Sequence, residues 1–172
     1  MSATKDFSSK QESLLASKLG WSVVSGSGAR PTAPGDIISD DWLGECKTHV
    51  KQDDTITFRQ DVWNKICREA VMKHRKPVLF VDDGTQTEDG AWALCKAGSL
   101  PVVSELTVAK YDKSIVKHIT FSHSAATDHL VSVKKLEGKM YAGLSAVWPG
   151  IDRGFDKVII MPFTTFKEIY DL

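Results

Sequence analysis

PGDIISDDWLGECK, residues 34–47, is the stretch of this 172-residue chain that decides the fold. Apolar residues stand on both sides of a polar turn near Asp40, which is the pattern of a β-hairpin. If that turn has two or four residues, Asp36 lies directly opposite Glu45, whereas a turn of odd length would move Asp36 to the other face. Glu45 and Lys47 share one face, because side chains alternate along a strand.

This hairpin brings two carboxylates and one ammonium together. Directly opposed residues on neighbouring strands have Cβ atoms about 5 Å apart. The carboxylates of Asp36 and Glu45 repel each other at that distance unless a cation lies between them or one of them takes up a proton. A hard divalent cation with oxygen ligands, Mg²⁺ or Mn²⁺, fits such a pair. Lys47 could then orient or deprotonate a water, or stabilise charge on a phosphate.

The same residues also have an ordinary structural interpretation. Asp36 follows Pro-Gly, so it could be a simple turn residue. Glu45 and Lys47 could be a surface ion pair on a half-exposed strand. The neighbouring segments therefore have to be weighed with the hairpin.

The segments before the hairpin predict a helix and a short strand. The helix runs over about 10–19 and ends at Gly20, and the strand covers 21–25. On this helix Glu12 shares the inward-facing apolar stripe, where an acidic side chain needs an explanation. One explanation is a ligand to a metal or to its water. The other is a capping box with Ser9.

The segments after the hairpin predict a second helix over about 59–74 and a buried strand over 78–81. The order helix, three strands, helix, strand indicates an α/β fold with a mixed central β-sheet flanked by helices. Gln60 begins the second helix on its core-facing stripe. It could touch the site, or it could be an ordinary polar residue at a helix start.

The remaining residues are interpreted as part of a single domain, 1–172. Its core covers about 8–95 and 157–172, with a strand at 157–161. Residues 96–156 form a β-containing insertion whose strands the pattern does not place.

Charge and cysteine content narrow the function classes. Basic and acidic residues each number 22, so a nucleic-acid-binding function must rest on how charge is distributed. The segment 59–76 is locally basic. This pattern is typical of a face that contacts DNA, but a solvated helix face has the same composition, so both interpretations stay open. Three cysteines without C-x-x-C spacing favour a reducing cytoplasm. The chain shows no signal peptide and no apolar run of about 18 residues, so we expect a cytoplasmic protein that has no membrane partner.

The order of these pieces resembles the PD-(D/E)xK nuclease superfamily, and within it the archaeal-type and phage Holliday junction resolvases. The resemblance covers about residues 8–82. It comprises a helix with a glutamate, a Gly/Ser loop, a Pro-x-Asp turn, a Glu-x-Lys strand and a helix that begins near a glutamine. The matching residues are Glu12, Asp36, Glu45, Lys47 and Gln60. The long insertion and the neutral net charge depart from the junction resolvases, and both departures bear on the substrate.

The resemblance implies a bacterial, archaeal or phage-encoded endonuclease that hydrolyses DNA phosphodiester bonds. Asp36, Glu45 and the backbone carbonyl of Cys46, with Glu12, would hold Mg²⁺, for which Mn²⁺ would substitute. Lys47 would offset developing negative charge. The enzyme would act as a homodimer on four-way junctions or other branched DNA. The expected DNA contacts are Ser27, Gly28 and Arg30 in the Gly/Ser loop, with His49 and Arg59.

Two other functions remain open from the sequence. The first is a restriction-like or general DNA nuclease, in which residues 96–156 read sequence or clamp duplex. The second is a catalytically inactive nucleic-acid-binding module with the same fold.

Overall fold

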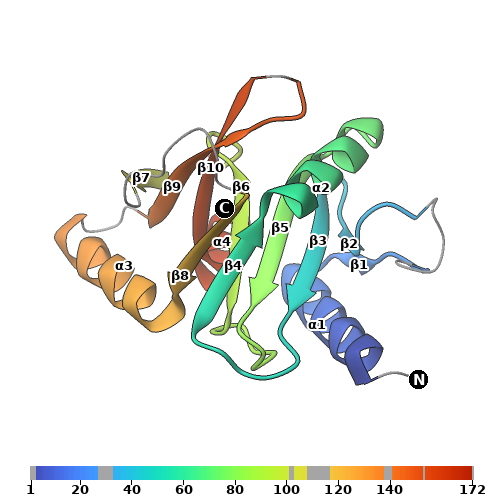
Figure 1. The fold of residues 1–172 in the computed structure, drawn as a ribbon, viewed down its shortest axis with the longest axis horizontal. Helices are drawn as coiled ribbons and strands as arrows, with labels where there is room; N and C mark the ends of the chain where they lie inside the picture. Colours follow the sequence, from blue (N-terminus) through green and yellow to red (C-terminus); the bar gives the residue numbers. More distant parts are fainter. Residues whose placement is uncertain are drawn as a thin grey trace.

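The computed structural model describes residues 3–26, 33–100, 103–107, 117–137, 141–152 and 154–171. The described strands form an eight-stranded mixed sheet, ordered β1-β2-β3-β5-β6-β10-β9-β7, and a two-stranded sheet of β4 and β8 (Figure 1). The predicted α/β fold, a mixed central sheet flanked by helices, is confirmed, and the arrangement is consistent with the restriction-endonuclease-like fold that the resemblance implies. The elements are α1 (Ala3–Leu19), β1 (Ser22–Val23), β2 (Ile37–Ile38), β3 (Trp42–Thr48), β4 (Thr55–Arg59), α2 (Gln60–Met72), β5 (Lys76–Asp82), β6 (Ala91–Lys96), β7 (Val103–Thr107), β8 (His118–Ser122), α3 (His123–Glu137), β9 (Tyr141–Pro149), β10 (Phe155–Pro162) and α4 (Phe163–Tyr170).

The first helix is longer than the sequence pattern predicts. α1 begins at Ala3 rather than near Lys10, so Ser9 lies inside the helix and is not its N-cap. Its first turns are polar and lack the apolar periodicity on which the prediction depended, while Asp6 suits the positive end of the helix dipole. The helix stops as expected at Gly20, which has φ +68°.

The hairpin of β2 and β3 is followed by a crossover connection that joins β3 to the parallel strand β5. β3 pairs parallel with β5, and the connection between them contains β4 and α2. The strand β4 is missing from the predicted order of elements. The alternating pattern of β4 buries Ile56 and Phe58 on one side. Such alternation is typical of a strand that has its other face in solvent.

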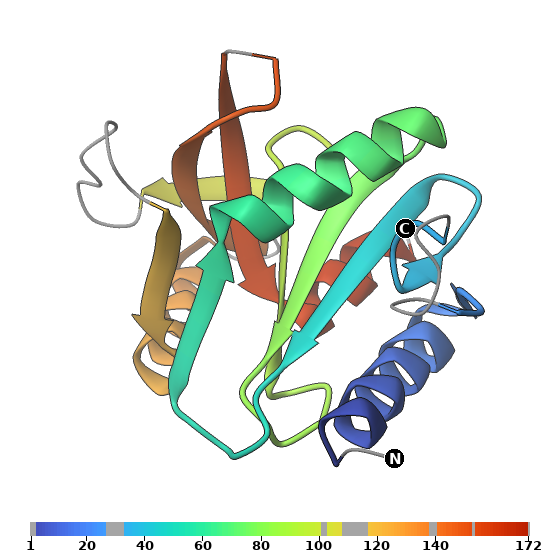
Figure 2. The ribbon, with the colours of Figure 1, turned by 45° about the vertical axis from the view of Figure 1, so that its right-hand side comes forward.

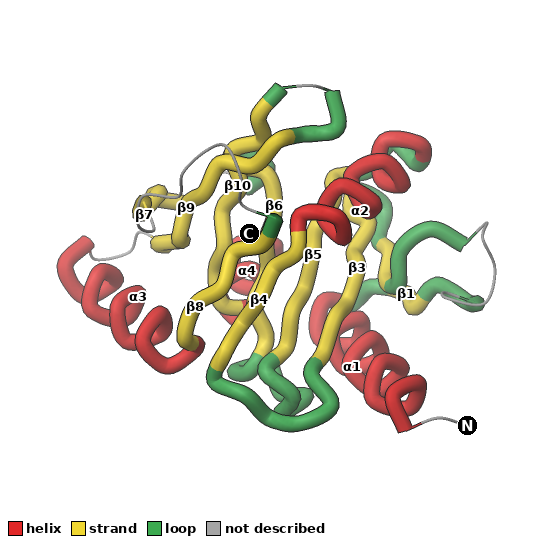
Figure 3. Tube along the Cα trace, in the orientation of Figure 1, coloured by secondary structure: helices red, strands yellow, loops and turns green. Residues whose placement is uncertain are grey.

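Residues 96–156 extend the central sheet. β9 lies between β10 and β7, antiparallel to the first and parallel to the second. β8 instead pairs with β4, and the two strands run side by side in front of the main sheet (Figure 3). The insertion therefore adds strands to the fold and also completes the β4–β8 ribbon, a pairing between residues about sixty positions apart in the sequence.

An apolar core lies on each face of the sheet. On one face Trp63 and Ile66 of α2 pack with Phe58 and Ile119 of the β4–β8 ribbon. On the other face the buried side chains of α1 and α4 pack together, including Phe166. Figure 2 shows α2 crossing one face with α4 behind the sheet. Among the helices that the structure describes, none is long and apolar enough to span a membrane.

Candidate active site

The carboxylate of Asp36 reaches across the hairpin to the strand that carries Glu45. Ile37 pairs with Gly44 and Ile38 with Leu43, which is the register that a two-residue turn predicts. The backbone N–H of Asp36 donates to the carbonyl of Gly44 at 2.8 Å. Its carboxylate oxygen Oδ2 accepts a hydrogen bond from the backbone N–H of Cys46, also at 2.8 Å. Asp36 is thereby fixed to both neighbours of Glu45 in the sequence.

Glu45 is a buried carboxylate with two ammonium partners. It is 3% exposed. Lys47 Nζ lies 2.6 Å from Glu45 Oε1, which confirms that these two side chains share one face of β3. Lys65 Nζ, from α2, lies 3.2 Å from each of the two carboxylate oxygens. A buried charge requires such pairing, because its loss of hydration is otherwise uncompensated.

The electrostatics of the pair suit a cation. Burial, and then the negative charge of Glu45, raises the pKa of the Asp36 carboxyl, although the Cys46 N–H and the lysines act in the opposite direction. Burial acts to lower the pKa of Lys47, but the charge and hydrogen bond of Glu45 outweigh it, and that pKa is raised. Lys47 is therefore an ammonium at neutral pH in this arrangement. That state supports charge stabilisation by Lys47 rather than proton abstraction.

Two residues of α2 belong to the site although the sequence analysis did not assign them to it. Lys65 and Glu69 are four residues apart on the same helix face, with Lys65 Nζ 3.8 Å from Glu69 Oε1. Glu69 Oε2 accepts a hydrogen bond from the backbone N–H of Gly35 at 2.9 Å. The helix thus holds both Glu45 and the turn before Asp36. The four-residue spacing of Lys65 and Glu69 could have predicted that they pair on one helix face. Their contacts with the β2–β3 hairpin could not be predicted, because these depend on how α2 packs against the sheet.

Helix α1 approaches the site from the opposite face of the sheet. Gln11, which is buried, donates from Nε2 to the carbonyl of Lys47 at 2.9 Å, and the sequence analysis missed it. Glu12 is 9% exposed, as its inward stripe predicts. Burial, followed by the charges of Asp36 and Glu12, raises the pKa of the Cys46 thiol well above its ordinary value, so Glu12 lies within electrostatic reach of β3. Because α1 begins at Ala3, the capping-box explanation of Glu12 is wrong.

Asp36 and Glu45 fit a metal ion that takes only some of its ligands from the protein and the others from water and substrate. Among the described residues, no group of three or more His, Cys, Asp or Glu side chains is placed to hold a metal ion. Mg²⁺ is commonly bound through one or two carboxylates together with waters and substrate phosphates. The Asp36–Glu45 pair has that donor chemistry. The Gln11 side-chain oxygen is also buried and accepts no hydrogen bond from the described residues.

Other predicted site residues lie elsewhere. Gln60 has no described hydrogen bond to Asp36, Glu45 or Lys47. Its side-chain Nε2 instead donates to the carbonyl of Pro149 at 3.2 Å. The reason is the geometry of α2, because Gln60 is its first residue and Lys65 lies more than a turn further along.

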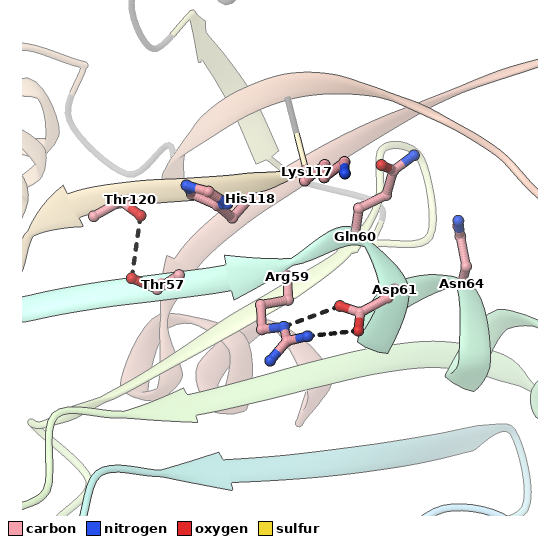
Figure 4. A pocket seen from close by; sticks show the side chains of 8 residues that line it. All are labelled: Thr57, Arg59, Gln60, Asp61, Asn64, Lys117, His118 and Thr120. Carbon is pink, nitrogen blue, oxygen red and sulfur yellow. Dashed lines mark hydrogen bonds and ion pairs between the residues drawn. The ribbon is translucent and has the colours of Figure 1, made fainter. Parts of the chain in front are cut away.

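Of the predicted DNA contacts, the structure describes Arg59 and His49. Arg59 ends β4 and pairs with Asp61, and with Gln60 it lines a polar pocket (Figure 4). His49 follows the last residue of β3, so strand alternation does not set its direction. Ser27, Gly28 and Arg30 lie outside the described residues. Comparison with known protein families, with curated proteins and with solved structures finds no match to this chain.

Proposed function

We propose that this protein is a metal-dependent DNA endonuclease that hydrolyses phosphodiester bonds at Asp36, Glu45 and Lys47. The observation that supports the proposal best is the buried carboxylate pair with an ammonium 2.6 Å from Glu45. A surface ion pair, the ordinary interpretation of Glu45 and Lys47, does not account for a glutamate that is 3% exposed. Nor does a turn residue require its carboxylate to be tied to Cys46.

Each residue has a defined part in the proposed reaction. Asp36 and Glu45, with the backbone carbonyl of Cys46, would hold Mg²⁺ or Mn²⁺. A bound ion of this kind polarises the scissile phosphate and lowers the pKa of a coordinated water. Lys47 offsets the negative charge that develops on the phosphate, at a fixed place that costs no reorganisation. Lys65 compensates the charge of the buried Glu45 through contacts of 3.2 Å to both of its carboxylate oxygens.

The proposed substrate is branched DNA, the four-way junction in particular. This rests on the resemblance in the order and spacing of Glu12, Asp36, Glu45 and Lys47. Symmetric cutting of a junction needs two active sites, so the proposal includes a homodimer, working in the cytoplasm. A restriction-like or general nuclease remains the second candidate, because residues 96–156 add β7, β8 and β9 to the fold, and β8 completes the ribbon with β4.

The experiment compares three labelled DNA substrates that share one sequence: a four-way junction, a linear duplex and a single strand. Wild-type protein is incubated with each in Mg²⁺ and, separately, in Mn²⁺. Glu45→Ala is the test variant. Glu168→Ala, which removes an exposed glutamate on α4, is the matched control.

The result we expect is paired nicks in the junction alone, lost in Glu45→Ala and kept in Glu168→Ala. Cutting of linear duplex with the same dependence on Glu45 would retain the site and move the function to a general or restriction-like nuclease. No cutting of any substrate would contradict the proposed function and would make the inactive binding module the leading account. Equal cutting by Glu45→Ala would contradict the assignment of Glu45 to the active site.

A further inference from the structure

A second polar site lies where the β4–β8 ribbon meets the start of α2. The cavity has a volume of about 760 Å³ (Figure 4). Every residue that lines it carries a hydrogen-bonding side chain. The lining residues are Thr57, Arg59, Gln60, Asp61, Asn64, Lys117, His118 and Thr120. Pockets for small organic molecules are mostly apolar, so this lining favours a polar, charged ligand.

The floor of this pocket is the outward face of the ribbon. Thr57 pairs with Thr120, and their hydroxyl oxygens lie 3.1 Å apart. Arg59 pairs in the same way with His118. The alternate residues of both strands face the core, where Phe58 and others are buried. The ribbon is therefore apolar inside and polar outside, and its outer side chains need no role in packing.

The charge of the pocket favours an anion. Among the described lining residues, two are cationic, Arg59 and Lys117, and one, Asp61, is a carboxylate, in a protein whose net charge is zero. Asp61 holds the Arg59 guanidinium through two bonds, Nε to Oδ1 at 3.0 Å and Nη2 to Oδ2 at 2.7 Å. Two oxygens of a phosphate match the same fork of donors. Asp61 thus orients Arg59 for a phosphate and also competes with one, since both side chains are 65% exposed.

Helix α2 links this pocket to the candidate active site. Asn64 lines the pocket, and the next residue, Lys65, contacts Glu45 at 3.2 Å. From Asp61 to Lys65 the helix advances by about 6 Å. A DNA strand whose phosphate lies at Glu45 would therefore pass the pocket within a few nucleotides. No Phe, Tyr or Trp is among the described lining residues, so the pocket suits the backbone of a strand rather than stacked bases.

We propose that this pocket binds the sugar-phosphate backbone of the DNA strand beside the phosphodiester that is cut, an inference that rests on the proposed function. Arg59 and Lys117 make the phosphate contacts. Gln60, Asn64 and the two threonines donate hydrogen bonds to sugar and phosphate oxygens. Contacts of this kind position a strand without reading its sequence.

The test measures DNA binding separately from cleavage. Fluorescence anisotropy with a labelled four-way junction and a labelled duplex, in EDTA, gives Kd at several salt concentrations. The variants are Arg59→Ala, Lys117→Ala and Asp61→Asn. The matched control is Lys10→Ala, which removes an exposed cation from α1, a helix on the opposite face of the sheet. All four changes lie at the surface, and a thermal melt verifies that each variant is folded.

We expect the loss of a basic residue to weaken DNA binding and the loss of the Asp61 charge to strengthen it. Arg59→Ala and Lys117→Ala each weaken binding roughly three- to tenfold and each lower the slope of log K against log salt by about one. Asp61→Asn strengthens binding by about two- to fivefold, because it removes a competing carboxylate. Lys10→Ala changes neither Kd nor slope. A merely structural Arg59–Asp61 pair would not make the Asp61 variant bind better.

Three other outcomes separate the two proposals. If Glu45-dependent cleavage occurs but the pocket variants bind like wild type, the pocket proposal is overturned and the proposed function stands. If the pocket variants show the predicted changes in binding while no DNA is ever cut, the pocket is supported and the nuclease function fails. If wild-type protein binds no DNA, both are overturned.

Discussion

The ammonium of Lys65, on α2, lies 3.2 Å from both carboxylate oxygens of Glu45, on β3. The two residues are twenty positions apart in the sequence, and α2, which follows β4, packs back against β3. Together with Lys47, which is 2.6 Å from the same carboxylate, Lys65 surrounds a buried anion with two half-exposed cations. This arrangement makes the lysines partly interchangeable for stability but not for chemistry.

The two lysines should therefore be coupled in stability. Lys47→Met or Lys65→Met alone costs about 0–1 kcal/mol of unfolding free energy, because the other ammonium remains and each lysine side chain is half exposed. The double variant leaves Glu45 buried without either ammonium and costs about 3 kcal/mol. Urea denaturation of the four proteins measures the coupling. The coupling should vanish in a Glu45→Gln background, and additive effects in the Glu45 background would contradict it.

The Asp36 carboxyl should destabilise the fold more at neutral pH than in acid. Its folded pKa is raised above the ordinary value of 3.8, chiefly by burial. A raised folded pKa gives a stabilising contribution that is complete below the unfolded value and lost as pH rises through the folded value. We expect Asp36→Asn to be more stable than wild type at about pH 7, with the difference shrinking toward about pH 4. Urea denaturation at both pH values checks this, and a gap that widens in acid would contradict it.

Gly35 should be far less tolerant of a side chain than Gly20, although their φ values are +67° and +68°. A Cβ on Gly35 would lie 2.8 Å from the side chain of Leu43, whereas one on Gly20 meets nothing within 4 Å. Gly20→Ala should cost about 1 kcal/mol for its backbone conformation alone. Gly35→Ala should cost about 2–4 kcal/mol and also slow cleavage, since it displaces Asp36. Equal costs for the two variants would show that the Leu43 contact is relieved.

Metal binding should stabilise the protein through Asp36 and Glu45 rather than through Glu12. At about a hundred times its Kd, Mn²⁺ adds about 2.7 kcal/mol and raises Tm by about 5–10 °C. Asp36→Asn should abolish that shift. Glu12→Gln should keep it, because the described residues include no three-carboxylate group. A thermal melt with and without Mn²⁺ gives the answer, and an undiminished shift in Asp36→Asn would place the metal elsewhere.

The hairpin was predictable because its determinants are local. Turn length and strand alternation together set the Ile37–Gly44 register and placed Lys47 beside Glu45, and both are observed. The α/β class followed from the order of periodic segments in the same way. These are properties of neighbouring residues, so no knowledge of distant contacts was required.

The features that the sequence analysis missed depend on contacts between residues far apart in the sequence. Lys65 and Glu69 were readable as a helical pair, but only the docking of α2 on β3 and β5 brings them to Glu45 and Gly35. The same docking leaves Gln60 beside Pro149. Pairing of β4 with β8 closes about sixty residues of chain, and no local pattern specifies such a partner.

The most direct test of the account is the single-turnover rate of junction cleavage by Asp36→Asn, with protein in excess and Mg²⁺ present. Asn keeps the size of the side chain and an acceptor for the Cys46 N–H, but it removes the charge that is proposed to hold the metal. We predict a rate at least about 100-fold below wild type, with Kd for the same DNA in EDTA unchanged or lower. Cleavage at the wild-type rate would contradict the assignment of Asp36 and Glu45 as the catalytic pair.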